Sequence, residues 1–243
     1  MHPQKIARAT GVLFLITFVT SIPALLLYDP ILKDHGYATY LAGAGADNQI
    51  FLGATLELLL ILANVGTALV LFPVLKRQSE ILALGYVAAR VVECVFIAVG
   101  ILSLLAVVTL RQHGAGADAA TLGVVGRALV AVKDATFLLG PGFIVGVGNG
   151  MILGYLMYGS GLVPRRMALF GLVGGPLICV SGLLVLFDVI GLGSSAQFIF
   201  SIPEIIWELS LGIYLTVKGF KPALLIGVEA RSDAAPALAP QLA

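Results

Sequence analysis

The stretch from Ile81 to Leu110, ILALGYVAARVVECVFIAVGILSLLAVVTL, is apolar almost throughout and long enough to cross a lipid bilayer as one helix. Arg90 and Glu93 nevertheless lie well inside it. A charged side chain near the centre of a spanning helix costs roughly 2.5–3.5 kcal/mol on insertion scales, so such residues are rare and usually face a partner or a wet cavity. The stretch therefore predicts a membrane helix whose polar centre has a structural or functional role.

The whole chain has the composition of a membrane protein. Of its 243 residues, 59% are hydrophobic and 11% are charged, and its mean hydropathy is +1.05. Soluble globular domains carry about 25% charged residues. The net charge of +1, without a basic stripe, argues against nucleic-acid binding. Cys94 and Cys179 fall in apolar stretches, which favours small buried side chains over a disulfide framework.

Apolar stretches alternate with short polar connections, and we predict an all-α bundle of six transmembrane helices within one domain, residues 1–220. The predicted spans cover about residues 7–28, 50–75, 81–110, 135–158, 167–190 and 198–217. The first apolar run is longer than the hydrophobic region of a signal peptide, so we expect it to be retained. Residues 221–243 are rich in Ala and Pro and are predicted to form a disordered cytoplasmic tail.

Two features complicate the helical pattern. Residues 119–134 look helical but are interrupted by charges such as Lys133, so we predict a separate lead-in helix at the outer interface. Pro141 is expected to break the fourth span early, and Pro176 to kink the fifth. Ser79 is a candidate N-cap for the third span.

Basic residues predict the orientation, because loops rich in Lys and Arg stay in the cytoplasm. One set of helix ends carries Lys5, Arg8, Lys76, Arg77, Arg165, Arg166, Lys218, Lys221 and Arg231. The opposite ends carry Lys33, Arg111, Arg127 and Lys133. We therefore expect a multi-pass protein of the bacterial inner membrane with both termini in the cytoplasm.

The charged centre of the third span has possible partners on its own helix and on the second span. Arg90 and Glu93 are spaced i, i+3, so they share one helical face and can pair. At 1.5 Å per residue, Glu93 lies about 18 Å from its cytoplasmic entry, and Glu57 lies about 10 Å from the outer end of its span. These depths are comparable, so Glu57 is an alternative partner for Arg90. Asn64 shares the face of Glu57.

Further carboxylates lie in the sixth span, where Glu204 and Glu208 are i, i+4 neighbours and Ser201 is on the same side. With Arg90 as the one cation, the spans hold a surplus of negative charge, which must bind a proton or a cation or face water. The side chains are either structural pins between helices or the lining of a titratable, cation-binding cavity. The candidate substrate- or ion-binding residues are Glu57, Arg90, Glu93, Glu204 and Glu208, with Asn64, Asp134 and Asn149 as secondary candidates.

The fourth span carries a ladder of glycines at four-residue spacing: Gly142, Gly146, Gly150 and Gly154. Such a ladder allows another helix to approach closely, since packing drives helix association in lipid. Gly171, Gly175 and Cys179 give the fifth span a matching small face. The ladder predicts tight packing, with a groove facing a substrate as the alternative. Asn149 beside it is placed to hydrogen-bond across the interface.

Signatures of cofactor enzymes are weak. His2, His35 and His113 lie in tails or loops, and none has a second ligand at metal-site spacing. Gly146-Val147-Gly148 does not complete a dinucleotide fingerprint, and no strand precedes it. We therefore expect no metal and no cofactor.

Three segments resemble a bacterial membrane family, the domain-of-unknown-function family 4386. They are ELLLILANVGTALVLFPVLKRQSEILALGYVAARVVE (Glu57–Glu93), FLLGPGFIVGVGNGMILGYLMYGSGLVPRRMALFGLVGGP (Phe137–Pro176) and PEIIWELSLGIYLTVKGF (Pro203–Phe220). The resemblance covers nearly the whole chain except the tail. The family implies a polytopic membrane protein and carries no activity to transfer. The chain departs from the family pattern at Lys133-Asp134-Ala135, where His-Asp and an aromatic residue are expected.

Three functional hypotheses follow. The first is transport or sensing of a small solute, proton or cation by the buried Glu/Arg cluster. The second is a membrane-embedded enzyme acting on a lipid-like substrate, with Glu93 or Glu208 as acid or base. The third is a structural or regulatory subunit that binds another membrane protein, or a second copy, through the glycine face.

Overall fold

A computed structural model of the chain describes residues 2–33, 36–43, 45–114, 116 and 118–221. Within these residues the protein is helical and has no strand. Six helical segments of the described chain are long and apolar enough to cross a membrane, as predicted. They are α1 (Pro3–Leu27), α4 (Asp47–Leu75), α5 (Glu80–His113), the run Ala119–Ser160, α8 (Arg165–Leu186) and α9 (Ser195–Val217). The predicted tail lies outside the described residues, apart from Lys221.

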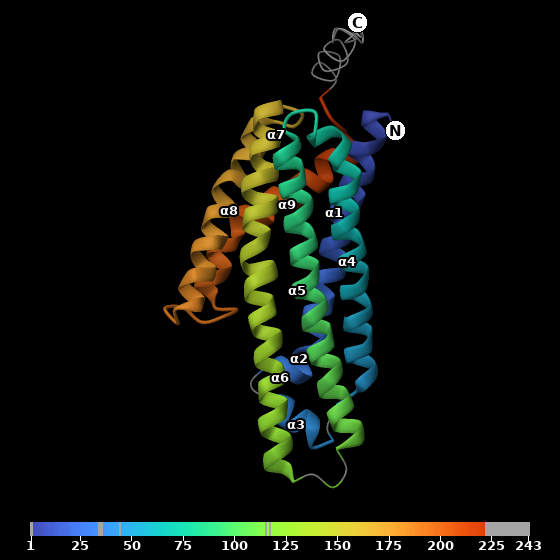
Figure 1. The fold of residues 1–243 in the computed structure, drawn as a ribbon, viewed down its shortest axis with the longest axis vertical. Helices are drawn as coiled ribbons and strands as arrows, with labels where there is room; N and C mark the ends of the chain where they lie inside the picture. Colours follow the sequence, from blue (N-terminus) through green and yellow to red (C-terminus); the bar gives the residue numbers. More distant parts are fainter. Residues whose placement is uncertain (1, 34–35, 44, 115, 117, 222–243) are drawn as a thin grey trace, which may run out of the picture.

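The two ends of the bundle differ. The short helices α2 (Asp29–Leu32) and α3 (Tyr37–Leu41) lie at what we call the distal end (Figure 1). The start of α1 and the end of α9 meet at the opposite, proximal end. There, Gln4 Nε2 donates to the carbonyl of Phe220 at 2.8 Å, and the amide of Phe220 donates to Gln4 Oε1 at 3.0 Å. The N-terminal end of the first span and the C-terminal end of the last span therefore lie on the same side of the bundle, as an even number of spans requires.

Side-chain caps define the starts of several helices. Ser79 Oγ accepts a hydrogen bond from the amide of Leu82 at 3.3 Å, which confirms the predicted N-cap of α5. Asp118 caps the helix that follows in the same way, through the amide of Thr121 at 2.9 Å. Pro176 lies inside α8 and does not end it.

The segment predicted as a separate lead-in helix is the first half of the fourth span. α6 (Ala119–Leu139) continues through the π-helical segments η2 (Gly140–Ile144) and η3 (Gly146–Leu153) into α7 (Gly154–Ser160). α6 lies alongside α5 (Figure 1), so the lead-in prediction was wrong. Pro141 does not break the helix either. We attribute this to the wider π-turns, which relieve the clash that a proline ring makes in a regular α-helix.

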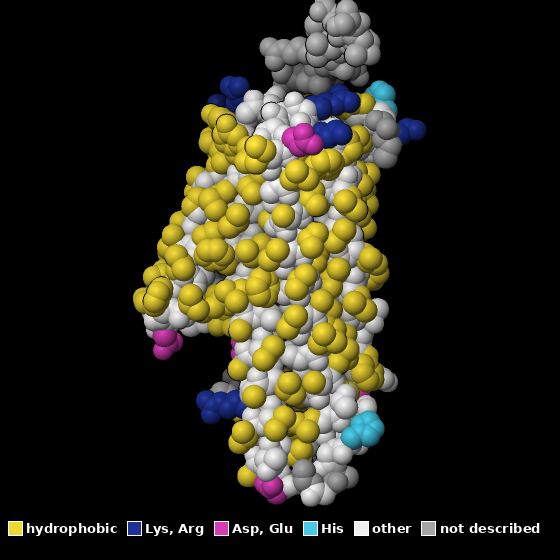
Figure 2. Space-filling view, in the orientation of Figure 1, with side chains coloured by type: hydrophobic (Ala, Val, Ile, Leu, Met, Phe, Trp, Pro, Cys, Tyr) yellow, Lys and Arg dark blue, Asp and Glu magenta, His cyan; other side chains and the backbone are white. Residues whose placement is uncertain are grey.

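The helices pack around three apolar clusters, the smallest of them between α4 and α5. α1 packs against α4 and α9, α5 lies between α4 and α6, and α8 packs against α9 and η3. The proximal cluster includes Phe14, Leu71, Tyr86 and Trp207, and the distal cluster includes Tyr28. Apolar side chains cover the sides of the bundle, while the visible charged side chains gather toward its two ends (Figure 2). This surface suits a hydrocarbon surrounding.

A polar network connects the helices at the distal end. Asp47 at the start of α4 accepts hydrogen bonds from the hydroxyl of Tyr40 and from Gln112 Nε2, the latter at 2.7 Å. Arg111 Nη1 lies 2.9 Å from Asp47 Oδ1, and its guanidinium stacks over the Tyr40 ring. Burial and the bond to Asp47 raise the pKa of Tyr40 to about 12, so its hydroxyl remains a donor at neutral pH. The network joins α3, α4 and the end of α5.

Candidate functional site

A cavity of about 290 Å³ lies inside the bundle. Its size is close to the lower limit of ordinary small-molecule sites. Its polar lining consists of Thr17 and Ser21 of α1, Glu57 and Asn64 of α4, Arg90 and Glu93 of α5, Lys133 of α6, and Ser201, Glu204 and Glu208 of α9. Apolar side chains including Phe18, Ile97, Phe137, Val145 and Ile178 complete the wall. All five primary candidates predicted from the sequence therefore lie around one cavity.

Arg90, Glu93 and Asn64 form a closed network on one wall. Arg90 Nη1 lies 2.7 Å from Glu93 Oε2, and this bond confirms the predicted i, i+3 pair. Asn64 Nδ2 donates to Glu93 Oε1 at 3.0 Å, and Arg90 Nη2 donates to Asn64 Oδ1. All three side chains are buried. Asn64 thus satisfies part of the hydrogen-bonding capacity of both charged partners, while Arg90 Nε has no hydrogen-bond partner among the described residues.

Glu57 pairs with Lys133 and not with Arg90. Lys133 Nζ lies 2.7 Å from Glu57 Oε1 and 3.0 Å from Oε2. The Tyr28 hydroxyl donates to Glu57 Oε2 at 3.0 Å, and Lys133 Nζ sits 4.9 Å from the centroid of the Tyr28 ring. We had counted Lys133 among the charges of the outer ends, and that placement was wrong. Its side chain is 5% exposed, because α6 carries it into the bundle.

The helical period of α6 could have revealed Lys133. Gly126, Lys133 and Thr136 are all buried, and their spacing of seven and three residues places them on one helical face. If the prediction had let this helix continue beyond residue 134, it would have placed Lys133 at the depth of Glu57. Asp134, a secondary candidate, is half-buried and is not part of the cavity lining.

Glu204 has the most unusual environment of the cluster. It is 2% exposed, and neither carboxylate oxygen has a hydrogen-bond partner among the described residues. Gly150 and Gly174 make room for it, since a Cβ on either glycine would lie 2.8 or 2.7 Å from Glu204 Oε2. Glu208 is an electrostatic neighbour and carries the same charge when ionised. An ionised carboxylate in this position lacks the partner that burial normally requires.

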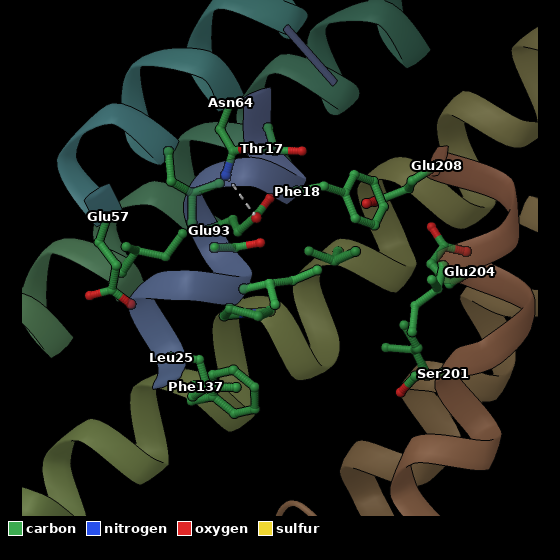
Figure 3. A pocket seen from close by; sticks show the side chains of 18 of the residues that line it. Thr17, Phe18, Leu25, Glu57, Asn64, Glu93, Phe137, Ser201, Glu204 and Glu208 are labelled. Carbon is green, nitrogen blue, oxygen red and sulfur yellow. Dashed lines mark hydrogen bonds between the residues drawn. The ribbon is translucent and has the colours of Figure 1, made fainter. Parts of the chain in front are cut away.

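Glu208 is held by the neighbouring π-helical segment. Asn149 Nδ2 donates to Glu208 Oε1, which confirms that Asn149 bonds across a helix interface. Trp207 Nε1 donates to the Asn149 carbonyl at 2.9 Å. Figure 3 shows Glu57 and Glu93 on one side of the pocket and Ser201, Glu204 and Glu208 on the other, with Thr17 and Phe18 between them. The two ion pairs thus face a wall whose carboxylates have no cationic partner within hydrogen-bonding distance in the described part of the chain.

Part of the glycine ladder packs within the chain, as predicted. A Cβ on Gly146 would lie 2.5 Å from the Gly175 carbonyl oxygen, and one on Gly150 would lie 2.3 Å from Gly175 Cα. η3 and α8 therefore approach at backbone distance. Gly171, also on the predicted small face of α8, lies against Gly154 of the ladder and against the Trp207 ring. An additional partner at the glycine face remains a prediction.

Residues 9–219 match the family described as Domain of unknown function (DUF4386). The chain belongs to this family. No curated protein and no solved structure matches it. The matched residues include the whole cavity lining, from Thr17 to Glu208, so the site is built entirely from the family domain.

In this DUF4386 domain, the cavity carries excess carboxylate. Glu57, Glu93, Glu204 and Glu208 face two cationic side chains, Arg90 and Lys133, so two negative charges are uncompensated when all groups are ionised. From the sequence we had counted Arg90 as the one cation among these side chains; Lys133 is the second. Within the described residues, no group of three His, Cys, Asp or Glu side chains is placed to hold a metal ion.

Proposed function

We propose that this protein binds a small positively charged solute in its central cavity, as a carrier or a sensor in the membrane. The cavity combines a closed wall of two ion pairs with an opposite wall that has surplus negative charge. Charged side chains at membrane depth are usually retained for such roles, because their insertion is unfavourable.

Glu204 is the observation that carries the proposal. A buried carboxylate whose two oxygens have no hydrogen-bond partner among the described residues needs a proton or a cation as its partner. Glu57 and Glu93 already have cationic partners, and Glu208 has an amide donor. An ammonium group suits Glu204 because it offers both positive charge and N–H donors, which form strong charge-assisted bonds with carboxylates. Protons compete for the same oxygens.

We further propose that the protein resides in a bacterial inner membrane with its proximal end in the cytoplasm. That end holds the start of α1, the end of α9 and the turn at Arg77, which lines the same surface pocket as Pro3. The loops and termini of this end carry the larger set of Lys and Arg residues.

The test uses the protein in lipid nanodiscs and the intrinsic fluorescence of Trp207. This residue is the one tryptophan of the chain, and it lies between Glu204 and Glu208 in sequence. Titration with methylammonium should give a saturable change, and affinity should decrease as the pH is lowered because protons compete. Glu204→Gln should weaken binding at least about tenfold, which corresponds to about 1.4 kcal/mol. Glu80→Gln is the control, since Glu80 is exposed at the start of α5.

Uptake of radiolabelled methylammonium into proteoliposomes separates the two roles. A carrier gives Glu204-dependent uptake, whereas a sensor gives binding without uptake. Equal binding by the parent and Glu204→Gln, or no binding at any pH, overturns the proposal.

A further inference from the structure

The cavity lies where α1 and α9 separate. Near the proximal end the two helices are in backbone contact, because a Cβ on Gly11 would lie 2.4 Å from the Thr216 amide nitrogen and 2.7 Å from the Gly212 carbonyl oxygen. Toward the distal end, both helices line the cavity, α1 through residues from Thr17 to Leu25 and α9 through residues from Ser201 to Glu208. Tight packing thus ends where the cavity begins.

Some lining residues also lie on the outer surface of the bundle. Ile22 and Leu25 of α1 are 56% and 47% exposed, and Ile205 of α9 is 37% exposed, yet all three line the cavity. They therefore mark its opening between the two helices. Ile205 is ten residues from the start of α9, which corresponds to a depth of about 15 Å. This is close to the middle of a hydrocarbon layer about 30 Å thick.

The chemistry changes along the cavity. The opening is apolar, while the interior contains Glu204 and Glu208. Phe18 and Phe137 also line the cavity, and aromatic faces stabilise ammonium groups by cation–π attraction. At about 290 Å³ the cavity has room for a charged head group and a short part of a chain. A longer apolar chain would have to extend through the opening into the bilayer.

We propose that the ligand is an amphipathic amine that enters from the bilayer between α1 and α9. Its ammonium group binds at Glu204, and its alkyl chain follows Ile22, Leu25 and Ile205 toward the hydrocarbon. This inference rests on the proposed function and specifies its substrate class and entry route. The alkyl chain of the ligand stays in an apolar environment on the way from the bilayer to the cavity. Its methylene groups are therefore never transferred into water, which would be unfavourable.

The experiment compares dodecylammonium, methylammonium and dodecanol in nanodiscs, with Trp207 fluorescence as the readout. Concentrations of the two long-chain probes are expressed as mole fractions in the bilayer, so that partitioning into lipid cancels. Dodecylammonium should bind saturably, and Glu204→Gln should weaken it at least tenfold. Dodecanol, which has the chain without the charge, should give no saturable change.

Variants at the opening test the route. Ile205→Phe should obstruct the gap and weaken dodecylammonium binding about tenfold, a larger loss than for methylammonium, which has no chain to pass through the gap. Ile206→Phe is the matched control, because Ile206 is 40% exposed on the same helix but does not line the cavity. If Ile205→Phe does not fold, Leu25→Phe and its control Leu26→Phe replace the pair, since Leu26 is exposed and also outside the lining.

Each other result overturns a defined statement. Binding of methylammonium without dodecylammonium, or unchanged dodecylammonium binding in the obstructed variants, refutes the bilayer route and leaves the proposed function standing. Equal binding of dodecanol shows that the cavity recognises the chain alone and refutes the amine. If neither amine binds, both the inference and the proposed function fail.

Discussion

Lys133 Nζ lies 2.7 Å from Glu57 Oε1, and this ion pair joins two helices whose contacting residues are 76 positions apart in sequence. It compensates a carboxylate that would otherwise add to the surplus charge of the cavity. It also fixes the position of α6 relative to α4. Tyr28, at the end of α1, donates a hydrogen bond to the same carboxylate. The pair therefore links three parts of the bundle at one point.

Replacing Lys133 by Met should destabilise the protein, because Glu57 then keeps its burial and loses its cation. Removal of one partner from a buried pair costs about 3–5 kcal/mol, and we expect about 3 kcal/mol here because the Glu57 side chain is 12% exposed. Glu57→Gln in the same chain should recover part of the loss. Melting temperature in detergent is the measurement. Arg127→Met, an exposed position on the same helix, is the control and should have little effect.

The local interactions could be predicted from the sequence. Arg90 and Glu93 pair because i, i+3 spacing places them together on any helix, and Ser79 caps α5 through the third residue after it. The prediction failed for Lys133, because the pair with Glu57 depends on how far α6 continues. Charges in residues 119–134 had suggested an interface helix, whereas Lys133 faces inward and is compensated by its ion pair with Glu57.

The environment of Glu204 could not be predicted from the sequence either, and the reason is different. Sequence placed it in an apolar span beside Glu208, but its lack of partners depends on how η3 and α8 pack around it. That packing requires the π-helical turns from Gly140 to Leu153, which change the rotational register of the residues that follow. A prediction that assumes regular α-helical periodicity does not include this change of rotational register.

The glycine contacts predict strong sensitivity to small side chains. Gly150→Ala and Gly146→Ala should each destabilise the bundle by about 1–3 kcal/mol, because the added methyl group meets the backbone of Gly175. Gly159→Ala is the matched control in the same helical run, since nothing lies within 4 Å of the Cβ it would add. Thermal unfolding in detergent compares the three. Parent-like stability of both test variants would mean that η3 and α8 are not closely packed.

The orientation prediction can be checked with reporter fusions. Because basic residues favour the cytoplasmic side, fusions after Leu75, Arg166 and Lys221 should report a cytoplasmic location, and a fusion near His113 should report the opposite side. A mixed pattern among the first three sites would contradict the six-span topology. A uniform inversion would preserve the topology and refute the orientation.

The last prediction separates the two ion pairs. Arg90→Ala should reduce stability by about 3–5 kcal/mol, because Glu93 is then left buried without its cation. Glu93→Gln in that background should restore part of the loss, since an amide carries no charge and can still bond to Asn64. Glu57→Gln should not restore it, because Glu57 is bound to Lys133.

Folded yield and melting temperature are measured for Arg90→Ala, both Gln variants and both double variants. If the stability losses are non-additive only in the Arg90–Glu93 double variant, Glu93 is the partner of Arg90, because residues in one network show non-additive effects. Better rescue by Glu57→Gln would instead show that Arg90 exchanges partners along the same wall of the cavity. Strictly additive losses in both double variants would show that Arg90 is solvated independently of either carboxylate, and the charged wall opposite Glu204 would then not be a closed network.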